Sequence, residues 1–60
     1  MIKCYIKEES GLFAVKAHDS KTDKTITIVL KSTKEIAKRF ADELLAAGQV
    51  DELQGVVENA

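Results

Sequence analysis

Residues Ser32–Gly48 read STKEIAKRFADELLAAG, and this stretch decides how the rest of the chain is arranged. Ser32 followed by Glu35 is a capping-box pattern, which predicts the start of a helix. Gly48 stands where a left-handed residue commonly closes a helix. We therefore expect a helix over about residues 33–47, packed on a sheet through one apolar side. The residues of that side recur at helical spacing and are Ile36, Phe40 and Leu44, widened by Ala37, Ala41 and Leu45.

The chain before this helix alternates between apolar and polar residues in three runs. The alternation predicts strands over about residues 1–9, 12–18 and 25–31. Ser10-Gly11 predicts a two-residue hairpin loop with Gly11 at positive φ. The polar stretch DSKTDK at residues 19–24 predicts the second turn.

One choice of register brings the apolar residues of all three strands to the same face, where the helix would cover them. The expected pairs are Glu9–Leu12, Ile6–Val15 and Cys4–Ala17 in the first hairpin, and His18–Thr25, Val15–Ile28 and Phe13–Leu30 in the second.

The last part of the chain also shows helical spacing. Val50, Leu53 and Val57 predict a short second helix over about residues 51–58, although Gly55 interrupts it. The expected fold class is therefore α+β. A three-stranded antiparallel meander has one face covered by a helix, and a short C-terminal helix follows, all in a single small domain over residues 1–60.

Length and composition limit the classes of protein this chain can belong to. Sixty residues with 45% hydrophobic residues form a small domain whose core gives only marginal stability. One cysteine allows no intramolecular disulfide, so packing or association must stabilise the fold. The sequence contains neither an apolar run long enough for a membrane span nor a signal-peptide pattern, so we expect a cytoplasmic protein that does not bind membranes.

The sequence predicts no catalytic site. Cys4 and His18 are the only Cys and His residues, and the register places them on opposite faces of the sheet. Cys4 is expected in the core and His18 at the surface. One Cys and one His do not make a structural zinc site, and no phosphate-binding glycine loop is present. We expect no enzyme activity, metal, cofactor or small-molecule substrate.

The sheet face that points away from the helix is the candidate interaction face. It carries lysines around a weakly apolar seam. Its residues are Lys3, Tyr5, Lys7, Ala14, Lys16, His18, Thr27 and Val29.

Three interpretations of this face stay open. The first is an ordinary solvated face. The second is a face that binds a protein partner or a second copy of the chain, with the apolar third strand TITIVL open to strand addition. The third is weak nucleic-acid binding through the lysines, and the order of three strands and a helix resembles, in topology alone, the sheet-reading DNA-binding domains of phage-type integrases. We expect a protein-binding or self-associating accessory or regulatory module of a bacterium or phage, with nucleic-acid binding as the alternative.

Overall fold

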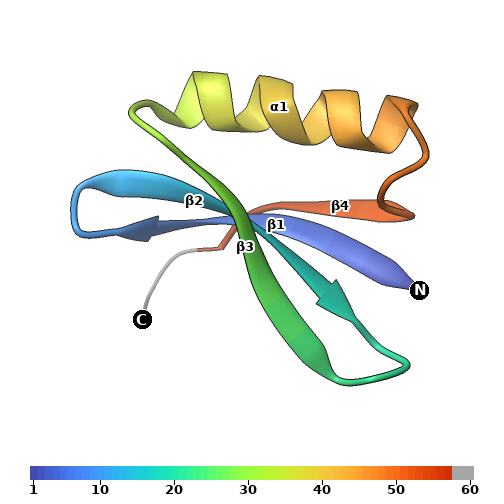
Figure 1. Cartoon of the computed structure of the whole chain (residues 1–60). Helices are drawn as coiled ribbons and strands as arrows, with labels where there is room; N and C mark the ends of the chain where they lie inside the picture. Colours follow the sequence, from blue (N-terminus) through green and yellow to red (C-terminus); the bar gives the residue numbers. More distant parts are fainter. Residues whose placement is uncertain (58–60) are drawn as a thin grey trace.

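The computed structural model describes residues 1–57 and shows one helix on one face of a four-stranded sheet (Figure 1). Strands β1 (Ile2–Glu9), β2 (Leu12–Asp19) and β3 (Lys24–Lys31) come first, followed by helix α1 (Lys34–Ala46) and strand β4 (Glu52–Val57). The strand order is β3-β2-β1-β4, and β4 runs parallel to β1 while the other pairs are antiparallel. The α+β class is as predicted. The sheet is mixed and four-stranded, however, and not a meander of three strands.

The first hairpin has the predicted register. Glu9 pairs with Leu12, and the same alignment continues to Cys4 beside Ala17. Ser10 and Gly11 have φ values of 53° and 80°. Positive φ at both loop residues matches the type I′ turn, whose twist suits a two-residue hairpin.

The second hairpin starts in the predicted register and then departs from it. His18 pairs with Thr25 as expected, but the register shifts between Lys16 and Val15 and leaves Ile28 as an extra residue on β3. The predicted pairs Val15–Ile28 and Phe13–Leu30 are therefore wrong. Val15 pairs with Val29, and Phe13 pairs with Lys31. A bulge of this kind exchanges the two faces of the strand beyond it.

Helix α1 begins one residue later than its sequence pattern predicts. The N-cap is Thr33, not Ser32, and the Thr33 hydroxyl accepts a hydrogen bond from the Ile36 N–H at 3.2 Å. The helix closes as expected at Gly48, which has φ 76° and whose N–H donates to the Leu45 carbonyl at 3.1 Å. No helix in the described part of the chain has the length and apolar character needed to cross a membrane.

The smallest residues of the helix make its closest contact with the sheet. Ala37 and Ala41 are buried, whereas Ile36 is 43% exposed and Leu45 is also exposed. The expectation that the larger side chains would be covered by the sheet is wrong for these two, because alanines let the helix approach closely and leave the larger neighbours at its sides. The buried core consists of Cys4, Ile6, Val15, Ala17, Ala37, Ala41 and Val50.

The predicted C-terminal helix over residues 51–58 is wrong. Residues 52–57 form strand β4, and Glu58 lies outside the described residues. Gly55 has φ 84°, which a right-handed helix does not allow, and it follows an irregularity in the pairing with β1. Of the three residues that suggested a helix, Val50 lies in the core before the strand, and Leu53 packs against the core together with Val56. Val57 points to the opposite side of the sheet.

Asp51 fixes the start of β4 to the start of β1. Its backbone N–H donates to the Ile2 carbonyl at 2.8 Å, and its carboxylate Oδ2 accepts from the Ile2 N–H at 2.7 Å. In the predicted second helix, Asp51 would have been the first residue. Its actual role is to satisfy both backbone groups of Ile2 beside the parallel strand pair.

Candidate interaction surfaces

The outer face is the side of the sheet opposite α1, and no described element covers it (Figure 1). The strand register places seven of the eight predicted interaction residues on this face. They are Lys3, Tyr5, Lys7, Ala14, Lys16, His18 and Thr27.

Val29 is the exception. Because of the bulge at Ile28, Val29 pairs with the buried Val15 and packs on the helix side of the sheet. Leu30 takes its place on the outer face and is 51% exposed. Val57 of β4 pairs with Lys7 and extends the same apolar row, and it too is exposed. Sequence reasoning missed Leu30 because it assumed an unbroken alternation, and it missed Val57 because it expected a helix there.

Ion pairs already engage two of the outer-face lysines. The Lys3 Nζ lies 3.7 Å from the Glu52 carboxylate, and the Lys16 Nζ lies 3.2 Å from that of Glu9. Lys16 and Glu9 stand two rows apart, so this pair bridges the row that contains Ala14, which is 0% exposed. Lysine stems commonly cover apolar surface in this way while the charged end stays near water. The outer face is therefore less positive than its lysine content suggests.

Cys4 and His18 lie on opposite faces, as predicted. Cys4 is buried, and burial raises the pKa of its thiol, so the nucleophilic thiolate is disfavoured. His18 pairs with Lys3 on the outer face, and its Nδ1 lies 2.8 Å from the Thr25 hydroxyl. Its Nε2 lies 3.3 Å from the carboxylate of Asp23, in the turn after β2. Both ring nitrogens thus have partners that hold the β2–β3 turn together.

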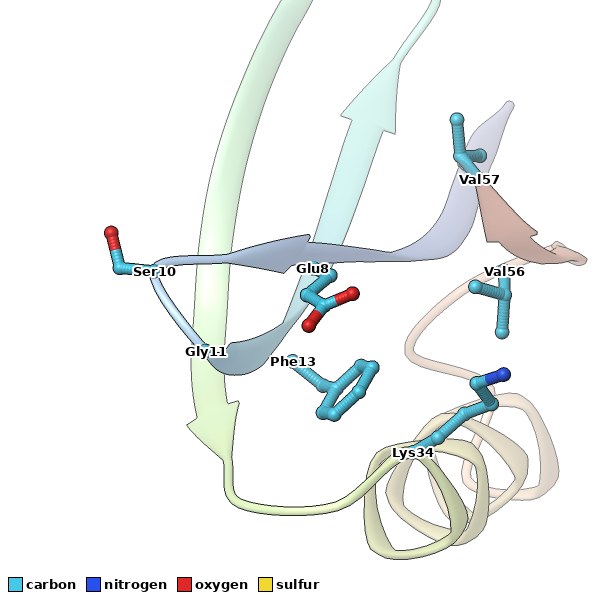
Figure 2. Close-up of a pocket in the computed structure, with 7 residues that line it drawn as sticks. All are labelled: Glu8, Ser10, Gly11, Phe13, Lys34, Val56 and Val57. Carbon is cyan, nitrogen blue, oxygen red and sulfur yellow. The ribbon is translucent and has the colours of Figure 1, made fainter. Parts of the chain in front are cut away.

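A hollow of about 440 Å³ lies between the β1–β2 hairpin and the start of α1. Figure 2 shows Glu8, Phe13, Lys34 and Val56 turned toward this space, while Val57 points away from it. The lining combines one acid, one base, one serine, one glycine and three apolar side chains, and it includes neither Cys4 nor His18. Among residues 1–57, no group of three His, Cys, Asp or Glu side chains could hold a metal ion.

Strand β3 forms one edge of the sheet, and the helix leaves much of it uncovered. Figure 1 shows the β2–β3 hairpin curving away from α1 toward its turn. Ile26 pairs with the buried Ala17 and so points to the helix side, yet it is 62% exposed. Ile28 at the bulge and Leu30 beyond it are also exposed. The edge strand therefore presents apolar side chains as well as the backbone groups that a terminal strand leaves unpaired.

An open groove of about 420 Å³ runs beside this strand, between β3 and the C-terminal half of α1. Asp19, Thr22, Lys24 and Gln49 supply its polar lining. Its apolar lining comes from Ile2, Ala17, Ile26, Ile28, Leu44 and Val50. The strand edge and this groove together are called the β3 surface below. Sequence reasoning noted the apolar third strand but not the groove, because the strand pattern does not tell where the helix stops covering the sheet.

The chain was compared with protein families, with curated proteins and with solved structures, and none of the three comparisons found a match.

Proposed function

We propose that this chain is a non-catalytic protein-binding module and that the β3 surface is its principal binding site. The observation that carries the proposal is the exposure of Ile26. A β-branched apolar residue in the middle of a strand, on the side that faces the helix layer, has 62% of its surface in water. Burying such a side chain fully contributes about 1.5–3 kcal/mol, so a partner that covers it gains affinity.

The backbone of β3 supports the same proposal. An edge strand offers a row of hydrogen-bonding groups to an incoming strand, and pockets for its alternate side chains then give specificity. Here the edge and an apolar groove lie side by side. A second copy of the chain or an unrelated protein would use the same groups, so homodimerisation is one form of this function.

The outer face is the secondary candidate for protein binding. Tyr5, Leu12, Leu30 and Val57 bring apolar surface to it, but two ion pairs cross it, and Ala14 is already covered. A partner would have to displace or accommodate these pairs. No ion pair crosses the β3 surface in residues 1–57, and its Ile26 and Ile28 already lie open.

The test compares the wild-type chain with Ile26→Lys and with the matched control Leu12→Lys, which places the same charge at an exposed leucine of the outer face. Sedimentation velocity over a concentration series measures self-association. Capture on the immobilised chain from a lysate of the source cells, with quantitative mass spectrometry, measures binding of other proteins. We expect an association that Leu12→Lys retains and that Ile26→Lys weakens about tenfold or more. A chain that stays monomeric and captures the same proteins with and without Ile26→Lys would contradict the proposal.

The competing proposal is weak nucleic-acid binding by the outer face. Its support is the placement of Lys3, Lys7 and Lys16 on one uncovered face beside Tyr5. The ion pairs of Lys3 and Lys16 count against it. Titration of duplex and single-stranded DNA and RNA at about 50 mM salt tests it, because phosphate contacts are strongest at low salt. Binding that weakens with salt and disappears in Lys7→Glu would favour this function over protein binding.

A further inference from the structure

The charges of β3 differ from those of the outer face. Lys24 and Lys31 stand at the two ends of the strand, and neither forms an ion pair with any residue in the range 1–57. Both belong to the helix side of the sheet, since Lys24 pairs with Asp19 and Lys31 pairs with Phe13. The Lys31 Nζ lies 5.0 Å from the centre of the Phe40 ring, which holds the ammonium near the helix.

The nearest acids on the adjoining strand and turn have partners of their own. The Asp19 carboxylate accepts a hydrogen bond from the Lys21 N–H at 2.9 Å. The Asp23 carboxylate lies 3.3 Å from the His18 ring. The β3 surface therefore has an apolar centre between two lysines that form no ion pair, and the acids nearest to them are Asp19, opposite Lys24, and Glu43, beside Lys31. Coulomb attraction favours a ligand with the complementary pattern, an apolar centre between two carboxylates.

The bulge sets the length of such a ligand. β3 has eight residues, yet β2 covers it with only the run from Phe13 to Asp19, because Ile28 is extra. A regular strand added at the open edge in the same antiparallel direction as β2 therefore needs about seven residues. Its first, third, fifth and seventh side chains lie on the groove side, opposite Lys31, Val29, Ile26 and Lys24. Acidic residues fit the outer two positions, and apolar residues fit the inner two.

We infer that the β3 surface binds an extended segment of a partner protein by strand addition, and that this segment carries acidic residues at both ends of a seven-residue stretch with alternating apolar residues between them. The inference rests on the proposed protein-binding function and names the chemistry of the partner. A second copy is disfavoured here. When two copies of β3 pair antiparallel over their full length with the groove sides together, Lys24 of each copy lies opposite Lys31 of the other. Like charges opposite each other destabilise a strand pair.

The experiment titrates two capped peptides, ETVTVTE and KTVTVTK, into the ¹⁵N-labelled chain and follows the backbone amide signals. We expect ETVTVTE to bind about tenfold more tightly, because two favourable cross-strand charge pairs replace two unfavourable ones. The shifted signals should map to β3 and the C-terminal half of α1. In the double variant Lys24→Glu with Lys31→Glu, the preference should reverse.

Two further variants keep the test decisive. Lys31 contacts Phe40, so a loss of structure in the double variant would be expected to come from that position. Lys24→Gln alone removes one of the two charges at an exposed residue and should leave a preference of about threefold. The matched control, Lys7→Glu with Lys38→Glu, reverses two charges away from β3 and should leave the tenfold preference unchanged.

Equal affinities for the two peptides, shifts confined to the outer face, or no binding up to about 1 mM would overturn the inference. So would a dimer whose interface maps to β3. These failures differ from the failure of the proposed function. If Ile26→Lys abolishes an association while the two peptides bind equally, protein binding stands and the acidic ligand is wrong. If neither peptide binds and Ile26→Lys changes no association, both proposals fall.

Discussion

Replacing Gly55 by alanine should destabilise the chain, and the sign of the effect depends on the backbone of β4. Gly55 has φ 84°, and a Cβ built there meets no atom within 4 Å. Steric contact with neighbours therefore adds nothing, and the whole cost comes from holding an L-residue in a left-handed conformation. That cost is about 1–2 kcal/mol and exceeds the gain from a stiffer unfolded chain. If residues 51–58 formed the helix that the sequence suggests, Gly55→Ala would instead stabilise the chain by about 1 kcal/mol.

Urea unfolding followed by circular dichroism gives the free energy of unfolding, and thermal unfolding gives a second measure. The cost less the gain leaves a net loss of about 1 kcal/mol. For a domain of this size, that loss corresponds to a decrease of roughly 4–8 °C in Tm for Gly55→Ala. Two controls separate conformation from composition. Asn tolerates the left-handed region better, so Gly55→Asn should lose less than Gly55→Ala. A synthetic chain with D-alanine at this position should gain about 0.4–1 kcal/mol. A more stable Gly55→Ala variant would refute the strand assignment.

Three further predictions concern the cap, the thiol and the helix contact. Thr33→Ala should lower the free energy of unfolding, measured in urea, by about 1 kcal/mol, because the Thr33 hydroxyl caps the Ile36 N–H. Ser32→Ala should change it by no more than about 0.5 kcal/mol, and equal losses in the two variants would contradict Thr33 as the N-cap. Burial raises the pKa of the Cys4 thiol above its ordinary value of 9.0, so the unfolded chain releases this proton at a lower pH than the folded chain does. The stability that the protonated thiol contributes is present below its ordinary pKa and is lost as the pH rises past that pKa. The free energy of unfolding of wild type should therefore fall relative to that of Cys4→Ala between about pH 8 and 10, and a difference that stays constant over this range would contradict the prediction. Ala37→Leu should lose about 1–3 kcal/mol by overfilling the helix–sheet contact, whereas Ile36→Ala should lose less than about 1 kcal/mol, and the reverse order would show that Ile36 is the central contact.

The parts of the fold that could be predicted from sequence depend on local signals. The first hairpin has strict alternation on both sides of Ser10-Gly11, so its turn and its register were predictable. The helix has a clear stripe and a clear end at Gly48. Its cap is one residue off because Ser32 and Thr33 are adjacent and chemically alike.

The tail could not be predicted because its partner lies at the other end of the chain. Val50, Leu53 and Val57 fit a helical period, and the short apolar run fits a strand equally well. The tail is a strand because it pairs in parallel with the open edge of β1, and no pattern within the tail itself reveals this pairing. Gly55 was the one residue of the tail that favoured a strand over a helix. Glycine destabilises a helix, whereas it adopts the positive φ found here without strain.

The candidate site was predicted in part for the same reasons. The outer face followed from the strand alternation, and the prediction fails at Val29, where the bulge at Ile28 reverses the faces. Nothing in the run TITIVL marks which residue is extra, because every residue in it favours a strand. The groove beside β3 depends on how far the hairpin curves from the helix, which is a property of the whole sheet.

The parallel pairing of β1 with β4 also affects how the chain is made. The bonds between Ile2 and Asp51 join residues 49 positions apart. At about 5–20 residues per second, Asp51 is synthesised roughly 2–10 s after Ile2, so β1 lacks its β4 neighbour during that interval. During that interval the strand that carries Cys4 and Ile6 has an open edge, and the chain is exposed to pairing with other nascent chains. Synthesis of β4 thus ends the period in which this edge of β1 is open to other chains.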